Sequence, residues 1–283
     1  MASVLTNAGS MAALETLRSI SRDMSTTQDR ISSGLKVGSA SDNAAYWSIS
    51  TTMQAQSSSL SVVGEALGMG ASLADVSSTA IESLVDLTKQ IRDRIVASGE
   101  STNDLSKIKT ELAQLTEQMT NTVAAAAFNG VNWLAATGPG AADLGATTKV
   151  LSGVTAGTFN YINVSLEATG AVNASESVAA LNTAVTALAA GAEQTALTAV
   201  DKALGELTEL GAKFGAASSR ITTQTDFISS LTDAIDRGVG ALIDADMNEE
   251  STRLKALQTQ QQLAVQSLSI ANSSTDLILQ LFR

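Results

Sequence analysis

A heptad pattern of apolar residues from Tyr46 to Ile95 limits the folds open to this 283-residue chain more than any other feature. Steps of three and four residues meet mostly apolar side chains, and no proline interrupts the run. The positions are Tyr46, Ile49, Met53, Gln56, Leu60, Val63, Leu67, Gly70, Ala74, Ser77, Ile81, Leu84, Thr88, Ile91 and Ile95. A pattern held for about seven heptads predicts one long coiled-coil helix with a seam in constant phase. At 1.5 Å per residue, the helix would be about 75 Å long.

A second apolar stripe follows another side of the same helix. It consists of Ala66, Met69, Leu73, Val76, Ala80 and Leu87. One partner helix cannot cover two sides. Gly64, Gly68 and Gly70 each cost about 1 kcal/mol relative to Ala in a helix, so packing has to stabilise this one. We interpret Gly68 and Gly70 as small residues for close helix packing.

The composition indicates that much of this helical surface is covered. Charged residues make up 16% of the chain, against roughly 25% in ordinary soluble proteins, and aromatic residues make up 3%. One interpretation is an Ala-rich helical protein with a Ser/Thr surface. The other, which we favour, is a helical protein that is buried against copies of itself.

Several classes of function are disfavoured by the composition. A net charge of −11 argues against binding to nucleic acid. The absence of histidine and cysteine removes the common zinc ligands, thiolate chemistry and the usual general base, so we expect no enzyme, no cofactor and no metal. Asp244, Asp246 and Asn248 begin an acidic run that invites a calcium interpretation. An EF-hand loop would need Gly at its sixth position and Glu at its twelfth, where the chain has Glu249 and Lys255.

The N-terminal segment does not have the pattern of a cleaved secretory signal. Residues 1–20 lack a basic start and a long apolar core, and they include Glu15. No window approaches the roughly 20 apolar residues that span a bilayer. We therefore expect no membrane insertion and, for an exported protein, a route without a cleaved signal.

Four further helices and two helix breaks are predicted. The helical period holds over residues 1–32, 105–126 and 197–242, and again from about Glu249 to the end. The breaks fall at residues 33–42, with Ser41 or Asp42 as the expected N-cap of the next helix, and at residues 244–246. Gly99 is the expected C-cap of the long helix, followed by Thr102 or Asn103 as an N-cap.

The centre of the chain has a different pattern. Asn129-Gly130 predicts a type I′ turn. Ile162, Val164 and Leu166 alternate as in a strand, and a short helix is expected from Ser175 to Ala190. The predicted fold is mainly α: a long antiparallel coiled-coil bundle of N- and C-terminal segments, with a β-hairpin and a small mixed α/β insert. The expected domains are terminal helices (1–42 and 244–283), a coiled-coil region (43–136 and 193–243, hairpin near 128–136) and the insert (137–192).

Several short segments resemble the bacterial flagellins, in the right order and over roughly two thirds of the chain. They are ISSGLKVGSASDNAA at 31–45, FNG at 128–130, GAASSRI at 215–221, DADMNEES at 244–251, LAVQSLSIAN at 263–272 and LFR at 281–283. Residues 137–192 lie where flagellins vary. The resemblance implies a structural subunit of the flagellar filament, which polymerises with itself and possibly with paralogues and lies outside the cell.

The resemblance also implies roles for particular residues. The terminal helices of many copies would form an inner tube, and the coiled-coil regions an outer one. Inner-tube contacts are expected from Leu17, Ile20, Met24, Ile31, Leu254, Leu257, Leu268, Ile278, Leu281 and Phe282. The spoke that joins the tubes would include Ser33, Gly34, Leu35, Ala40, Asp42, Asn43, Asp244 and Asp246. Further partners implied are hook–filament junction proteins, the filament cap, an export chaperone and the flagellar type III export apparatus.

The family's surface for an innate immune receptor aligns with residues 89–94 here. Lys89, Arg92 and Arg94 form a basic cluster that we interpret as a solvated helix face with acidic partners at Asp86 and Asp93. Arg92 matches the stimulatory form of the family, whereas Gln90 stands in place of Arg and Arg94 in place of an apolar residue.

Two other interpretations remain. A hook–filament junction protein shares the terminal helices, but residues 244–283 resemble flagellin more. A signalling coiled coil of the chemoreceptor type would need a polar hairpin tip and a membrane segment, which the sequence lacks.

Overall fold

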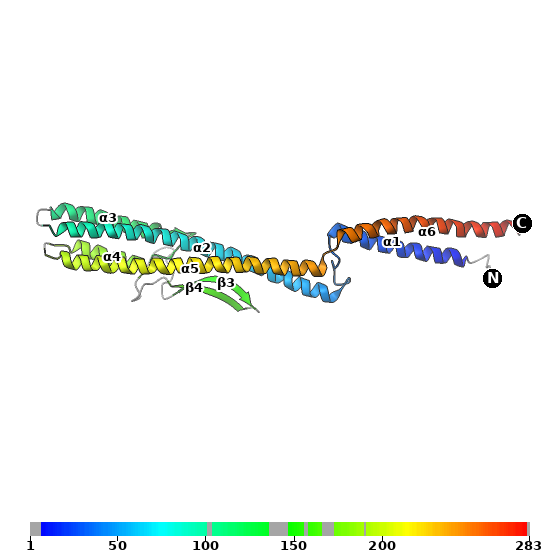
Figure 1. Ribbon diagram of the computed structural model, residues 1–283, viewed down its shortest axis with the longest axis horizontal. Coiled ribbons are helices and arrows are strands. Elements are labelled where there is room, and N and C mark those ends of the chain that lie inside the picture. The colour runs from blue at the N-terminus through cyan, green and yellow to red at the C-terminus, as the bar shows by residue number, and fades with distance from the viewer. Residues whose placement is uncertain are drawn as a thin grey trace. The chain divides into compact units, whose positions relative to one another are not determined.

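The computed structural model describes residues 7–100, 104–135, 147–155, 158–165, 173–189 and 191–281. The elements in these ranges are mostly helices, and they confirm the predicted mainly α fold (Figure 1). The helices are α1 (Ala8–Ser33), α2 (Ala44–Ser98), α3 (Leu105–Ala125), α4 (Ala174–Thr186), α5 (Glu193–Ile243) and α6 (Met247–Leu281). The strands are β1 (Ala127–Phe128), β2 (Val131–Asn132), β3 (Thr147–Thr155) and β4 (Thr158–Ser165).

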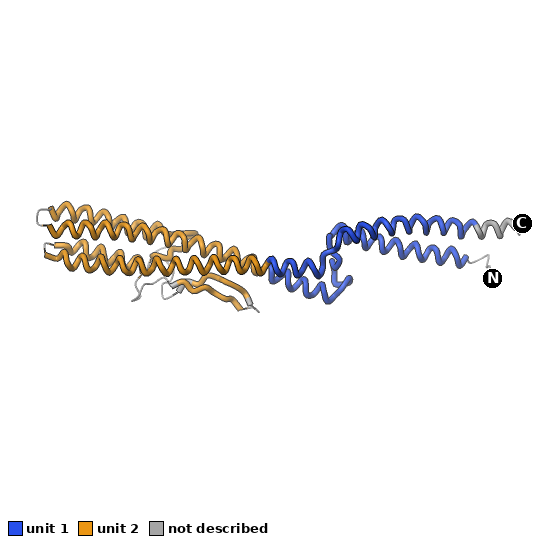
Figure 2. The backbone as a smooth tube through the Cα atoms, viewed as in Figure 1, with its two compact units in different colours: residues 1–57, 233–283 blue, residues 58–232 orange. Residues whose placement is uncertain are grey.

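The chain divides into two compact units (Figure 2). Unit 1 contains residues 1–57 and 233–283, and unit 2 contains residues 58–232. The long helices α2 and α5 each contribute to both units.

In unit 1, α1 and α6 run side by side in opposite directions (Figure 1). The Asn7 side chain donates a hydrogen bond to the Ala271 carbonyl at 3.0 Å. Ile20 and Thr27 are the buried residues of α1, and Leu257 is buried on α6. The helices pack along one face each, because apolar residues recur on that face with a helical period.

In unit 2, the seam of α2 is buried as predicted from Leu60 onward. Leu67, Leu84 and Ile91 are completely buried, as are the polar seam residues Ser77 and Thr88. Both hydroxyls donate to the carbonyl four residues earlier, so their burial leaves no unpaired donor.

The seam does not hold its phase over the first turns of α2. Tyr46 and Ile49, which the heptad pattern placed in the seam, are exposed. Ser50 is buried and Ser57 half-buried in place of Ile49 and Gln56, whereas Met53 and Leu60 keep their seam positions. The prediction of constant phase was therefore wrong here, because small hydroxyl residues face α5 where apolar ones were expected.

The short helix α4 is part of the core of unit 2. Asn173 and Glu176 form a capping box at its N-terminus. Val178, Leu181 and Val185 are buried on its inner face, and α4 packs against α3. The predicted helix 175–190 is thus confirmed in its position, and its buried apolar residues are part of the helical core of unit 2.

Two antiparallel hairpins complete unit 2. Asn129 (φ 51°) and Gly130 (φ 78°) have the left-handed backbone of a type I′ turn and join β1 to β2. The second hairpin pairs the expected strand, β4, with β3, which the sequence did not predict. Leu166 lies outside the described residues. Trp133, which follows the first hairpin, is buried and stacks on Phe214 with ring centroids 5.9 Å apart.

Two predicted helix caps were wrong. The Asn43 side chain, rather than Ser41 or Asp42, accepts from the N–H groups of the first turn of α2. Asp104 caps α3, and the expected Thr102 and Asn103 lie outside the described residues. Gly99 does follow the end of α2, but without left-handed backbone.

Gly70 has a different role from the close helix packing predicted for it. A Cβ atom there would lie 2.6 Å from a methyl group of Val150 on β3. A Cβ on Gly68 would meet nothing within 4 Å. Glycine at position 70 therefore lets the β3–β4 hairpin lie close against α2.

We predict opposite effects of alanine at these two glycines. Gly68→Ala should raise the free energy of unfolding by up to about 1 kcal/mol, because it removes only the helix penalty of glycine. Gly70→Ala should lose that gain and weaken amide protection in residues 149–164, because Val150 has to move. Chemical unfolding and hydrogen exchange of both variants check this. Equal stabilisation by both would contradict the close approach.

Candidate functional site

The break between α1 and α2 pairs with the break between α5 and α6. Gly34 ends α1 with left-handed backbone (φ 74°), and its N–H donates to the Arg30 carbonyl at 2.8 Å. Leu35 then forms an antiparallel bridge with Asp244, and the Gly34 carbonyl accepts from the Ala245 N–H. The structure therefore brings together Gly34, Leu35 and Asp244 of the predicted spoke.

Apolar residues on both sides of the break form a small core. Val37, Val239 and Ile243 are buried together. Leu35, Met53, Ile235 and Leu242 pack around them. The N–H groups of Lys36 and Val37 both donate to the Ile243 carbonyl, at 2.6 and 3.2 Å. Backbone pairing and burial together fix the relative position of the two breaks.

Carboxylates and an amide shape the turns at the break. The Asp42 carboxylate accepts from the N–H groups of Gly38 and Ser39 and from the Ser39 hydroxyl, at 2.9–3.1 Å. The Ser39 hydroxyl is the main cause that holds the pKa of Asp42 below its ordinary value, followed by the Ser39 N–H, while slight desolvation acts in the opposite direction. Asp246 accepts from the N–H groups of Asn248 and Glu249 and so caps α6. Ser33 and Ala40 are exposed residues of the same break.

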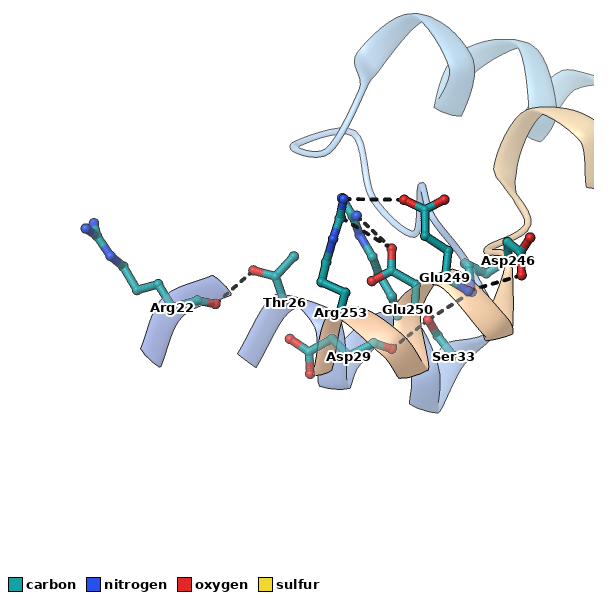
Figure 3. A network of polar contacts seen from close by, with 10 residues as sticks. Arg22, Thr26, Asp29, Ser33, Asp246, Glu249, Glu250 and Arg253 are labelled. Atoms are coloured by element: carbon teal, nitrogen blue, oxygen red, sulfur yellow. Dashed lines mark hydrogen bonds and ion pairs between the residues drawn. The ribbon is translucent and has the colours of Figure 1, made fainter. Parts of the chain in front are cut away.

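A buried ion pair ties α1 to α6 next to the break (Figure 3). Glu250 Oε1 lies 3.1 Å from Arg30 Nη1 and 3.8 Å from Arg253 Nη1. The Glu250 side chain is 6% exposed, and its Oε2 has no hydrogen-bond partner among the described residues. The exposed neighbour Glu249 pairs with Arg253 at 3.4 Å. The sequence had indicated only an acidic run that begins at Asp244.

The predicted inner-tube residues mostly lie between α1 and α6 of one chain. Ile20 and Leu257 are buried, and the other described side chains of this set are half-buried: Leu17, Met24, Ile31, Leu254 and Leu268. Nothing is described of the side chains of Ile278 and Leu281, and Phe282 lies outside the described residues.

Other large apolar side chains of these helices are exposed. They are Met11 and Leu14 on α1, and Leu263, Val265 and Ile270 on α6. Met11 and Leu14 line a groove of about 1310 Å³ together with Glu15, Arg18 and Arg22. Leu263 and Ile270 form part of a second stripe that is visible in the sequence, whereas Met11, Leu14 and Val265 have no comparable signal.

The basic cluster of α2 is paired within unit 2. Lys89 pairs with Asp86, as expected, at 2.9 Å. Arg92 pairs instead with Asp201 of α5 at 2.8 Å, and Arg94 with Glu111 of α3 at 2.9 Å. Asp93 had been the other expected partner. The two guanidinium groups thus link three helices of the same chain.

The described residues contain neither a cluster for a metal ion nor a membrane-spanning helix. No group of three or more Asp and Glu residues in the described ranges is arranged to hold a metal ion. None of the helices in these ranges is long and apolar enough to cross a membrane.

Comparison with known proteins gives matches over both ends and over the whole length. The family model of the bacterial flagellin N-terminal helical region matches residues 4–138, and that of the C-terminal helical region matches residues 197–282. Flagellin C of Rhizobium meliloti (strain 1021) is 42% identical over 322 residues, which cover 100% of both chains. A flagellin of Brucella melitensis biotype 1 is 42% identical over 284 residues, again with 100% of both chains covered.

A solved structure has a similar fold. It is a protein of Vibrio parahaemolyticus named as flagellar hook-associated, with a TM-score of 0.56 over 72% of this chain and 100% of that one. At 16% identity, this likeness concerns the fold alone.

We predict that Glu250 holds α1 against α6. Glu250→Gln should weaken the charge-assisted bond to Arg30, worth about 1–3 kcal/mol for a buried partner, and speed amide exchange across residues 20–33. Glu249→Gln is the matched control, since it removes the adjacent, exposed carboxylate. Hydrogen exchange of the assembled and free protein measures both. Equal effects of the two changes would contradict a special role of Glu250.

We also predict that the turn at residues 38–42 opens in acid. A lowered pKa of Asp42 means that its hydrogen bonds stabilise the turn above its unfolded pKa, near 3.9, and that this stability is lost as the pH falls through the folded-state pKa. The NMR signals of the Gly38 and Ser39 amides should therefore hold through the pH range in which an ordinary Asp titrates and change only at lower pH. Asp42→Asn should shift them at neutral pH, whereas Asp23→Asn on α1 should not.

Proposed function

The chain belongs to the flagellin family, and from that premise we propose how its parts serve a flagellar filament of which it is a structural subunit. The family resemblance of the sequence motifs is confirmed, and with it self-polymerisation. The observation that carries the proposal is the set of exposed apolar residues on two helices that already pack together, namely Met11 and Leu14 on α1 with Leu263, Val265 and Ile270 on α6.

The terminal helices would be covered only in the polymer. α1 and α6 bury one face each against each other, and a pair of helices leaves their other faces in water. Burial is worth roughly 25 cal/mol per Å² of apolar area, which neighbouring copies can supply. Residues 1–42 and 244–283 would form the inner tube, and residues 43–136 and 193–243 the outer one.

The paired helix breaks would act as the spoke between the two tubes. Backbone pairing of Leu35 with Asp244 and the small core around Val37 support this role, because they keep both crossings together. The ion pair of Arg30 with Glu250 would then fix where the inner-tube helices begin.

Two alternatives are less well supported. A hook–filament junction protein has support only from a fold likeness at 16% identity, against flagellin relatives at 42% over the full length. A signalling coiled coil has no support from the matched families.

The further partners are those that export and assembly of such a subunit require. We assign them as hook–filament junction proteins, a filament cap, an export chaperone and the flagellar type III export apparatus. Export would involve no cleaved signal, and the assembled subunit would lie outside the cell in the filament. Co-purification of a chaperone with the unassembled chain tests the export part. A cleaved N-terminus in protein taken from filaments would contradict it.

We predict that only part of the 137–192 insert is dispensable for assembly. Replacing residues 137–172 by a short Gly/Ser linker should allow filaments, because loop closure costs grow slowly with length. Replacing 137–192 removes α4 as well and uncovers the core around Leu181, so this variant should lose unit 2 stability.

Electron microscopy after seeding, with helicity by circular dichroism, measures both variants. The unmodified chain is the positive control and tests the function itself: failure of that chain to form filaments would contradict it. Loss of assembly by the 137–172 replacement, with its helicity retained, would show that the β3–β4 hairpin belongs to the lattice.

We predict weak stimulation of the innate immune receptor for flagellin. Gln90 lacks the guanidinium of the stimulatory form, and Arg94 is charged where that form is apolar and is paired with Glu111. Reporter cells that express the receptor should respond more to the monomer with Gln90→Arg and Arg94→Leu, and no more with the control Lys89→Gln. A full response to the unmodified monomer would refute the prediction.

A further inference from the structure

The first part of α2 has an exposed surface without a single charge. Between Asn43 and Gly64 the sequence has no Asp, Glu, Lys or Arg. Ser50, Met53, Ser57 and Leu60 form the buried or half-buried side, and most other positions are exposed. Soluble surfaces usually carry about a quarter or more charged residues. We call residues 44–56 of this helix, all in unit 1, the uncharged stem face.

Large apolar side chains stand on the uncharged stem face. Tyr46, Trp47 and Ile49 are 46%, 40% and 49% exposed. The rest of the exposed positions are small or hydroxyl and amide residues, among them Ser48, Thr51, Thr52 and Gln54. Such a surface offers close approach and hydrogen-bond donors, and it brings no charge to a contact.

The part of α5 that pairs with this stretch has the opposite character. Met53 approaches Gly238 closely, and Ser57 donates to Asp236 at 2.8 Å, so the two stretches are packed together. The same part of α5 lines an open groove of about 670 Å³, formed by Asp233, Asp236, Arg237, Gly240, Ala241 and Asp244. Three carboxylates against one guanidinium make this groove acidic.

We propose that the uncharged stem face of one copy packs on the acidic groove of α5 in the next copy. The inference rests on the proposed self-assembly and adds where along the long helices a lateral contact lies. Each copy has a net charge of −11, so acidic faces that meet one another repel. The uncharged stem face is a surface on which an acidic groove can lie without that repulsion. Its Gln54 amide can donate to a carboxylate, whereas the hydroxyls of Thr51 and Thr52 donate to carbonyls of their own helix.

The two surfaces are different, and this decides the kind of assembly. A contact between two unlike surfaces of the same molecule repeats from copy to copy, and it builds a ring if the rotation closes or an open helical polymer if it does not. A contact of the stem face with itself would be two-fold and would end at a dimer. The placement of both surfaces on one pair of helices therefore suits a filament.

A pair of opposite charges at Thr52 tests the proposal. Thr52 is exposed, and its hydroxyl bonds only to the Ser48 carbonyl of its own helix. Both Glu and Lys favour helix more than Thr, so neither should disturb the fold, which circular dichroism of the monomer verifies. The measured quantity is the critical concentration for seeded polymerisation, at low and at high salt.

The sign of the charge should decide the outcome. Thr52→Glu should raise the critical concentration at least about tenfold at low salt, with partial recovery at high salt, because it faces carboxylates. Thr52→Lys should leave it within about twofold or lower it. The double change Thr52→Glu with Asp233→Lys should recover assembly. Asn163→Glu and Asn163→Lys on the exposed side of β4 are matched controls and should have no effect.

The other outcomes overturn the proposal. Normal assembly of both Thr52 variants means that the stem face is not a contact, and failure of both means that it meets a surface other than an acidic one. These results are distinct from a failure of the proposed function, in which the unmodified chain itself would not polymerise.

Discussion

The fold depends on burial of the α2 seam from Leu60 to Ile95. Nearly all of its residues are less than 10% exposed. Most of them are apolar, and Ser77 and Thr88 contribute buried hydroxyl groups. Each fully buried Leu or Ile contributes about 1.5–3 kcal/mol, which outweighs the helix penalties of Gly64, Gly68 and Gly70. α3, α4 and α5 are positioned in unit 2 by the need to cover this seam and the second stripe beside it.

Unit 1 is stabilised differently from unit 2, because polar contacts and backbone pairing contribute more around its helix breaks than apolar burial does. The turn at Asp42, the bridge of Leu35 with Asp244 and the ion pair of Arg30 with Glu250 all lie within one short stretch around the two helix breaks. A small apolar core at Val37 supplements them. Such an arrangement fixes directions but buries little area, so several large apolar residues of α1 and α6 stay exposed in the single chain.

The sequence predicted those features that repeat or that need a particular residue. The long helices follow from period, and the turn at Asn129-Gly130 follows from the left-handed backbone that both residues adopt there. β3 was missed because its pattern is interrupted by a register shift near Gly153, which hides the alternation. The helix caps were misplaced because adjacent Ser, Asp and Asn residues all qualify, and only the path of the chain selects Asn43.

The site was predicted less completely than the fold. The break residues were found by resemblance, but the pairing of Arg30 with Glu250 spans 220 positions of sequence and involves no local pattern. The exposure of Tyr46 and Ile49 could not be predicted either. An apolar residue at a heptad position gives the same sequence pattern whether it packs within its own chain or against another copy.

The two tryptophans of the chain stand in opposite surroundings, and this has a spectroscopic consequence. Trp133 is 1% exposed and stacked on Phe214, so its emission reports on the interior of unit 2 in any state of the protein. Trp47 is 40% exposed on α2, where water quenches and red-shifts its emission. Replacing either Trp by Phe separates the two fluorescence signals. The emission of Trp47 alone would then report when the uncharged stem face becomes buried.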